Sequence, residues 1–283
     1  MKIIECPRDA LQGLHEFVPT EQKIEYINQL LKIGFDTIDF GSFVSPKAIP
    51  QMRDTKEVLS HLDLKGSKSK LLAIVANARG AHEASEYENI SYLGFPLSLS
   101  ETFQRKNTNK SIAEALEELL IIQDICKEHN KILVTYLSMG FGNPYGDPYE
   151  MNYVLDFVAK LKKLDIQIIS LADTVGISNP ENIKTLFSSV VNQFPEIEFG
   201  VHLHSDLDSA IDKVEAAYKA GCRRFDGAIN GFGGCPMAED KLVGNIATEN
   251  MLAYFDEFSI PVDFDMRELK KAMNIAPTVF LGR

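Results

Sequence analysis

The sequence predicts an α/β protein, a closed (β/α)8 TIM barrel, on the basis of two observations. Short apolar runs rich in β-branched residues recur eight times along the 283 residues, at 3–4, 37–38, 71–75, 90–93, 132–137, 166–171, 197–201 and 224–229. Segments of helical period lie between most of these runs. Strands that alternate with helices pair in parallel through right-handed crossovers, and eight such units fit a chain of this length.

An open, doubly wound sheet is the alternative architecture. A dinucleotide-binding sheet would carry a glycine-rich turn after its first strand, but residues 5–9 read ECPRD. The sequence therefore favours the barrel.

The helical segments show the expected periodicity. Residues 20–31 carry apolar side chains at helical spacing, with Thr20 as the expected N-cap. Residues 111–129 have one apolar face, expected to consist of Ile112, Ala115, Leu116, Leu119, Leu120 and Ile122. Residues 251–283 predict one or two helices and an exposed tail, with Leu269, Met273 and Ile275 packing on the outside of the barrel. We therefore expect a single catalytic domain over 1–283, with the barrel over about 1–250.

Composition narrows the range of partners. The chain has 29 basic and 40 acidic residues and a net charge of −11, which argues against a nucleic-acid or anionic membrane surface. No stretch approaches the roughly 20 apolar residues of a membrane span. The four cysteines are scattered without a CxxC pair, and residues 1–5 lack the apolar core of a signal peptide. We therefore expect a reducing, cytoplasmic compartment.

The strongest chemical signal is the HxH pair in the seventh run. Residues two apart in a strand project to the same face, so His202 and His204 should point to one place. Two imidazoles form half of a site for a divalent metal, and the remaining ligands must come from elsewhere in the chain.

In a barrel, functional side chains gather at the carboxyl ends of the strands. Polar residues occupy these positions in the sequence: Arg8, Asp9, Asp39, Ser42, Asn77, Arg79, Tyr136, Ser138, Asp173, Thr174, His202, His204 and Asn230. For Ser138 and Thr174 taken alone, capping of the next helix is the better interpretation.

A glycine-rich loop follows the eighth run. Residues 231–234 read GFGG, and Cys235 comes next. Such a loop can approach a ligand closely, and its thiol would then lie near the site. The alternative is a flexible turn with an incidental cysteine.

Taken together, the motifs resemble those of the 3-hydroxy-3-methylglutaryl-CoA lyase family, a branch of the pyruvate-carboxyltransferase-like metallolyases built on TIM barrels. The matching stretches run in family order over about residues 3–250: PRDALQ at 7–12, SFVSPK at 42–47, PQM at 50–52, SETF at 100–103, KN at 106–107, FGNPY at 141–145, LADTVG at 171–176, VHLH at 201–204, GFGGCPMA at 231–238 and GNIATE at 244–249. The FVSPK and GxGGCPxA stretches are specific to the lyase branch.

The resemblance implies a metal site and a reaction. The metal ligands would be Asp9, His202, His204 and Asn245, a mostly hard set that suits Mg²⁺ or Mn²⁺ better than zinc. The reaction would be cleavage of 3-hydroxy-3-methylglutaryl-CoA to acetyl-CoA and acetoacetate.

The resemblance also implies residue roles. Arg8 would stabilise the developing oxyanion, and Cys235 would protonate the acetyl-CoA enolate. Asp9, or a water that it holds, is the first candidate base and Asp173 the second, with Asp39 in the same catalytic shell. The expected substrate-binding residues are Arg8, Gln12, Ser42, Lys47, Lys106, Asn107 and Thr174, and Arg79 and Arg105 are further candidates for coenzyme A contacts.

Three positions depart from the family pattern. Asp39 stands where a glutamate is usual, Gly13-Leu14 where an Asn-Glu pair is common, and Met237 where a tyrosine is frequent. The first two leave a related acyl-CoA open as the substrate. A Claisen-type acyltransferase and a barrel that binds acyl-CoA without turnover are the alternative functions. A small-molecule acyl-CoA partner is expected, and a homodimer is left open.

Overall fold

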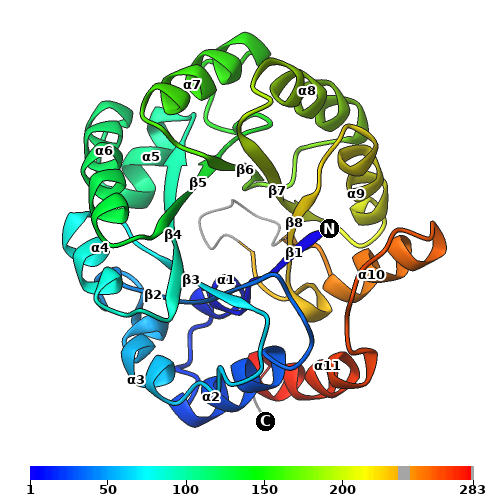
Figure 1. The fold of residues 1–283 in the computed structure, drawn as a ribbon. Coiled ribbons are helices and arrows are strands. Elements are labelled where there is room, and N and C mark those ends of the chain that lie inside the picture. The colour runs from blue at the N-terminus through cyan, green and yellow to red at the C-terminus, as the bar shows by residue number, and fades with distance from the viewer. Residues whose placement is uncertain (235–242, 282–283) are drawn as a thin grey trace.

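The chain forms a closed barrel of eight parallel strands surrounded by helices (Figure 1). The computed structural model describes residues 1–234 and 243–281. Neighbouring strands pair in sequence order, and pairings of β8 with β1 and of β6 with β7 complete the ring. The strands are β1 (Lys2–Glu5), β2 (Thr37–Ser42), β3 (Lys70–Ile74), β4 (Ile90–Ser98), β5 (Ile132–Ser138), β6 (Ile168–Asp173), β7 (Glu198–Ser205) and β8 (Arg224–Gly227). The prediction of a (β/α)8 barrel is confirmed.

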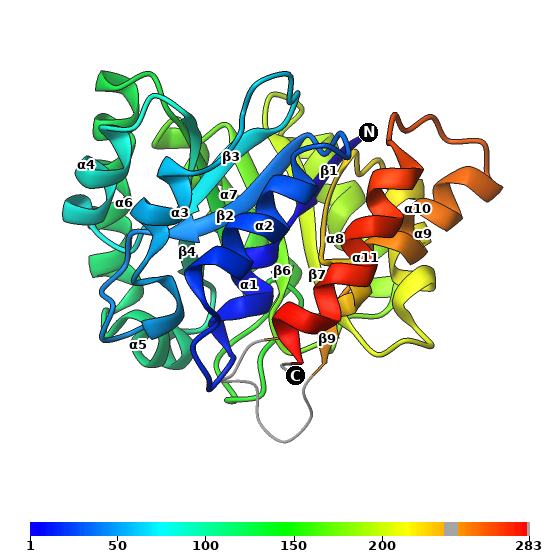
Figure 2. The ribbon, with the colours of Figure 1, turned by 90° about the horizontal axis from the view of Figure 1, so that it is seen from below.

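The helices form the outer layer, and a short strand, β9 (Gly244–Asn245), adds to β7 in antiparallel orientation. The helices are α1 (Pro7–Gln12), α2 (Thr20–Leu30), α3 (Thr55–Ser60), α4 (Ala78–Ser85), α5 (Glu101–Thr108), α6 (Ile112–Glu128), α7 (Met151–Lys163), α8 (Pro180–Gln193), α9 (Ala210–Lys219), α10 (Thr248–Glu257) and α11 (Met266–Phe280), with 3₁₀ turns η1 (Pro50–Met52) and η2 (Ile229–Gly231). Figure 2 shows the N-terminus at one end of the barrel and β9 at the other. None of the helices in the described ranges is both long and apolar enough to cross a bilayer.

Two helical details differ from expectation. Pro19 rather than Thr20 precedes the first turn of α2, because the Thr20 hydroxyl donates a hydrogen bond to Asp54 at 2.9 Å instead of capping the helix. In α6, Ser111 forms the N-terminal cap as part of a capping box with Glu114. Leu120, however, is 44% exposed, because α6 carries more apolar residues than its buried face can cover.

The C-terminal segment forms two helices, as expected. In α11, Leu269 is buried, whereas Met273 and Ile275 are partly buried against the core. The helix packs on α2, where the rings of Tyr26 and Phe280 meet edge to face at 5.4 Å. This contact joins α11, near the C-terminus, to α2, near the N-terminus, on the outside of the barrel.

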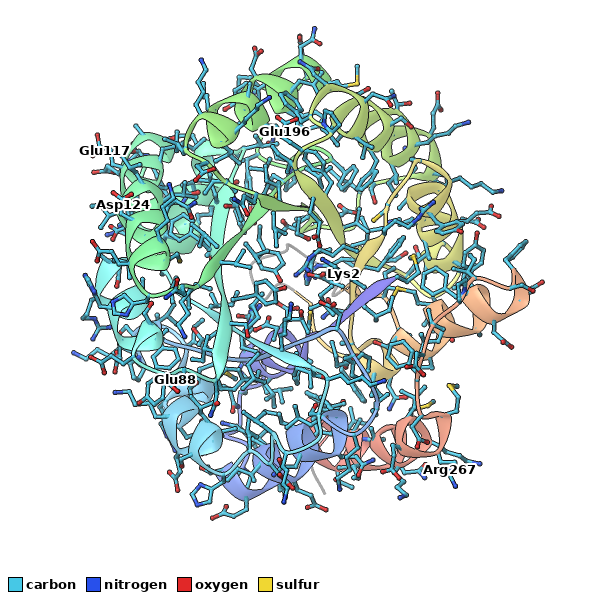
Figure 3. The ribbon with its side chains drawn as sticks, in the orientation of Figure 1. Lys2, Glu88, Glu117, Asp124, Glu196 and Arg267 are labelled. Atoms are coloured by element: carbon cyan, nitrogen blue, oxygen red, sulfur yellow. The ribbon has the colours of Figure 1, made fainter. Side chains whose placement is uncertain are left out.

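The barrel interior is apolar on one side and polar on the other. Alternate residues of β3 divide between two clusters: Leu71 joins the large core under the helices, and Leu72 joins a small separate cluster with neighbours from β4, β5 and β6. On β8, the same alternation turns Arg224 and Asp226 inward, and both are buried. Figure 3 shows Lys2 near the barrel axis, while Glu117 and Asp124 lie at the periphery.

A buried carboxyl group joins the first strand to the segment after the eighth. Glu5 is fully buried and accepts hydrogen bonds from the Ile229 amide at 2.8 Å and the Thr248 hydroxyl at 2.6 Å. Burial outweighs these hydrogen bonds and raises the pKa of Glu5 to about 8. The folded protein therefore holds a proton on Glu5 at neutral pH.

This proton predicts a pH-dependent stability. Between pH 5 and 8 the unfolded chain has released the proton of Glu5, whose ordinary pKa is 4.5, whereas the folded chain keeps it. The wild type should lose stability as pH rises through this window, by up to about 4 kcal/mol from this group. Glu5→Gln should remove that loss, so its thermal midpoint should exceed that of the wild type increasingly from pH 5 to 8. Parallel midpoint curves would contradict the assignment, and the exposed Glu25→Gln variant is the control.

Candidate metal centre and active site

Three potential metal ligands converge at the carboxyl end of the barrel. The side chains of Asp9, His202 and His204 are buried, and one ligand atom from each lies within 4.8 Å of the others. The Asp9 Oδ2 atom is 4.0 Å from His202 Nε2 and 3.9 Å from His204 Nε2. The amide nitrogen of Asn245 donates to the same oxygen at 2.9 Å. All four residues expected to bind metal therefore lie together.

Local structure explains how residues so distant in sequence meet. The alternation of β7 turns both imidazoles inward. Pro7 starts a short helix directly after β1, and its first turn places Asp9 over the barrel mouth. The antiparallel pairing of β9 with β7 sets Asn245 opposite His204.

Hydrogen bonds orient both imidazoles in the same way. The Nδ1 atom of His202 lies 3.2 Å from Asp226 Oδ2, and that of His204 lies 3.0 Å from the carbonyl oxygen of Thr174. Each ring is then protonated at Nδ1 and presents a free Nε2 lone pair toward Asp9. The His204 Nε2 atom is buried and has no hydrogen-bond partner among the described residues. A carboxylate and two imidazole lone pairs so arranged fit a divalent cation.

The charges around Asp9 keep it ionised. Burial alone would raise its pKa, but Arg8, His202 and His204 outweigh burial and lower the pKa to about 2. Burial lowers the pKa of His204, whereas for His202 the carboxylate partners overcome burial and raise the pKa. The site thus combines a permanent negative charge with two imidazoles.

Arg8 connects this group to Asp39. Its guanidinium donates to the Asp39 carboxylate through Nε at 3.0 Å and Nη2 at 2.6 Å, and its Nη1 donates to Asp9 at 3.2 Å and Gln12 at 2.8 Å. Burial raises the pKa of Asp39 to about 6, although Arg8 opposes that shift. Gln12 also donates to Asp9 at 3.0 Å, so it belongs to the same network.

The other expected substrate-binding residues lie outside this network. Ser42 is buried at the end of β2, where its hydroxyl donates to the Ile74 carbonyl at 3.2 Å. The hydroxyl of Thr174 accepts a hydrogen bond from the Met139 amide at 3.2 Å. Three residues are exposed: Lys47, Asn107 and Lys106, whose ammonium lies 4.3 Å from the Tyr145 ring centroid.

The suggestion that Ser138 and Thr174 cap the following helices is wrong. Glu150 occupies the N-cap position of α7, and Asn179 caps α8 through its side chain. Thr174 instead supplies the carbonyl that orients His204 and accepts the Met139 amide on its hydroxyl.

Asp173 lies behind the site and holds the loop after β6. Its carboxylate accepts hydrogen bonds from the Ile177 amide and from the amide and hydroxyl of Ser178, and it pairs with Lys213 at 3.2 Å. The buried Lys213 ammonium also donates to the His204 carbonyl at 2.9 Å. Because its oxygens are occupied in this way, Asp173 is better suited to anchoring β7 than to accepting a substrate proton.

Sequence reasoning missed two residues of this surrounding shell. Asp226 was counted only as part of an apolar run, although a charged residue between Phe225 and Gly227 marks an inward-facing strand position. Lys213 falls at helical spacing with the buried residues Ala210, Val214 and Ala217 of α9, and a lysine on such a stripe indicates a buried ion pair.

Cys235 lies outside the described residues. The glycines that lead to it are described: Gly231, Gly233 and Gly234 all have positive φ angles. A Cβ atom on Gly233 would lie 2.6 Å from Asn245 Nδ2 and 2.8 Å from Ala10 Cα, so only glycine lets the chain cross here. The segment before Cys235 therefore runs directly against the metal-ligand group.

Comparisons with known proteins agree with this geometry. A family model described as HMGL-like matches residues 2–276. The chain is 34% identical over 266 residues to hydroxymethylglutaryl-CoA lyase YngG of Bacillus subtilis, covering 94% of this chain and 88% of that protein. It is 32% identical over 276 residues to the cytoplasmic 3-hydroxy-3-methylglutaryl-CoA lyase of Rattus norvegicus, covering 96% and 79%.

Solved structures show the same relationship. An HMG-CoA lyase from Acinetobacter baumannii, in complex with coenzyme A and 3-methylmalate, matches with a TM-score of 0.91 and 34% identity, covering 99% of this chain and 91% of that one. The carboxyl transferase domain of Rhizobium etli pyruvate carboxylase matches with a TM-score of 0.76 and 16% identity, covering 100% and 47%, and shares the fold.

The ligand group predicts graded losses of metal affinity. His202→Ala should weaken Mn²⁺ binding by more than Asn245→Ala, because imidazole is the stronger ligand and water can replace an amide oxygen. The loss for His202→Ala should exceed the roughly 10-fold to 100-fold cost of changing an outer-shell partner. Electron paramagnetic resonance of free Mn²⁺ measures the dissociation constant of each variant. The control is His82→Ala, at an exposed position, which should leave the affinity unchanged. Unchanged affinity in His202→Ala would exclude His202 as a ligand.

Proposed function

Because the chain belongs to the HMGL-like family, we propose that it is a carbon–carbon lyase that cleaves 3-hydroxy-3-methylglutaryl-CoA to acetyl-CoA and acetoacetate. The convergence of Asp9, His202 and His204 beside the Arg8 guanidinium is the structural observation that carries this proposal. The nearly full-length similarity to lyases favours cleavage over the Claisen-type transfer that remained open from the sequence.

The proposed metal is Mg²⁺ or Mn²⁺, held by Asp9, His202, His204 and the amide oxygen of Asn245. These oxygen and imidazole donors, without a thiolate, match the preference of such ions. When bound, the ion would acidify the tertiary hydroxyl of the substrate and orient it.

We assign proton removal to Asp9, or to a water that it holds, rather than to Asp39 or Asp173. Asp9 faces both imidazoles, whereas both oxygens of Asp39 accept hydrogen bonds from Arg8, and the oxygens of Asp173 are occupied by the loop after β6 and by Lys213. The hydroxyl proton passes to the Asp9 carboxylate, directly or through that water, the C2–C3 bond breaks, and C3 becomes the ketone of acetoacetate. The electron pair of the broken bond moves onto the thioester as an enolate.

Arg8 stabilises that enolate. Four of its five N–H groups are engaged by described residues, which hold the guanidinium rigidly, and a second N–H on Nη2 remains for substrate. A fixed positive charge in a buried site stabilises a developing oxyanion without reorganisation.

Cys235 completes the proposed reaction by protonating the enolate carbon to give acetyl-CoA. Its place after Gly233 and Gly234 supports this role, because that segment lies against Asn245 and Ala10. The exposed Lys47, Lys106 and Asn107 remain the proposed contacts for coenzyme A. The cytoplasm is the proposed compartment, since all three described cysteines are free thiols.

Product analysis tests the reaction. The purified protein with Mg²⁺ or Mn²⁺ should convert 3-hydroxy-3-methylglutaryl-CoA to equimolar acetyl-CoA and acetoacetate, and a chelator should abolish turnover until metal is restored. Incubation of acetyl-CoA with 2-oxo acids is the parallel assay. Condensation products there, without cleavage in the first assay, would identify a Claisen-type transferase instead.

Replacement of Cys235 tests the final protonation. General acid catalysis contributes about 10²-fold to 10⁴-fold, so Cys235→Ala should lose that factor in kcat with little change in thermal midpoint. Cys126, buried in α6, is the matched control, because Cys126→Ala should lower the midpoint more than the rate. A Cys235→Ala enzyme within about threefold of wild-type kcat would remove the proton-donor role.

A further inference from the structure

We propose that Asp226 is a positioning residue for the metal ligand His202, and that its carboxylate fixes the tautomer and orientation in which His202 binds the ion. The inference rests on the proposed function, since it assumes that His202 is a ligand. It adds a residue that the resemblance did not assign and that comes from β8, the strand between β7 and β1.

Strand pairing brings the two side chains together. His202 and Asp226 are register partners on β7 and β8, and both turn toward the barrel interior. His202 Nδ1 lies 3.2 Å from Asp226 Oδ2, and the side chain of Asp226 is fully shielded from solvent. The edge-to-face contacts of the His202 ring with Tyr136 and His204 limit its rotation further.

A carboxylate at Nδ1 has a defined effect on an imidazole ligand. It accepts a hydrogen bond from Nδ1–H, which keeps that proton on Nδ1 and leaves the Nε2 lone pair available on the side that faces Asp9. The negative charge also makes the imidazole a better electron donor to a cation. His204 receives only the Thr174 carbonyl at the equivalent atom, so the two imidazoles are held unequally.

Arg224 provides the charge that offsets Asp226. It precedes Asp226 by two residues on the same face of β8 and is 1% exposed. Its Nη1 lies 3.4 Å from Glu198, whereas its Nε and Nη2 have no hydrogen-bond partner among the described residues, and neither has Asp226 Oδ1. Room for Arg224 comes from Gly200, where a Cβ atom would lie 2.9 Å from Arg224 Cδ.

A purely structural role for Asp226 explains less. The backbone ladder already joins β7 to β8, at Val201 with Phe225 and at His202 with Asp226. Burying a carboxylate and a guanidinium inside a barrel costs free energy that an apolar pair would avoid. The side chain of Asp226 therefore adds little to strand pairing, and its specific contact is with the imidazole.

Metal affinity measured without turnover tests the proposal. Mn²⁺ binding to purified protein, followed by electron paramagnetic resonance, should weaken about 10-fold to 100-fold in Asp226→Ala. Asp226→Asn, whose amide oxygen can still accept a hydrogen bond from Nδ1–H but carries no charge, should lose less. The control is Asp54→Asn, a buried carboxylate paired with Lys23 at 2.9 Å away from the site, which should lower the thermal midpoint and leave Mn²⁺ affinity unchanged.

The outcomes separate the two levels of inference. Folded Asp226→Ala with Mn²⁺ affinity within about threefold of wild type, below the expected range, overturns the positioning role and leaves the proposed function intact. Absence of Mn²⁺ binding by the wild type overturns both. If neither variant at position 226 folds under conditions in which Asp54→Asn does, Asp226 is a structural residue and the positioning role is overturned.

Discussion

The pairing of β7 within the closed sheet is the constraint on which the site depends. Parallel ladders to β6 and β8 hold the strand on both sides, so its alternate side chains point inward without freedom to slip, because a one-residue shift would turn His202 and His204 outward. The short antiparallel strand β9 adds Asn245 to the same strand. Two imidazoles and an amide are thereby placed on hydrogen-bonded strands of one sheet.

Electrostatics set the chemistry of this rigid frame. Arg8 lies between Asp9 and Asp39 and contacts both, yet their environments drive the pKa values apart, to about 2 and about 6. Asp9 therefore stays ionised, as holding a cation requires, whereas Asp39 titrates near neutral pH. The two pKa values differ because Asp9 lies closer to the imidazoles and Asp39 is more completely desolvated.

The polar half of the barrel interior lies next to the proposed metal ligands. An ordinary barrel core is filled with branched apolar side chains, and here only the side formed by β3 to β6 follows that pattern. On β7 and β8, Arg224 and Asp226 extend the polar network from the barrel interior to His202. Lys213 and Asp173 support the same strand from behind. The residues that surround the proposed ligands therefore lie on the strands and helices of the barrel itself.

The sequence by itself predicted the barrel and the common face of His202 and His204, because strand periodicity is a local property. The ligand set of Asp9, His202, His204 and Asn245 came from motifs that resemble those of a known family. Only the tertiary structure decided which carboxylate faces which charge, that Thr20 bonds Asp54 instead of capping, and that Asp226 and Lys213 join the site. These features depend on register and burial between strands far apart in the chain, and a pKa is set by neighbours in space rather than in sequence.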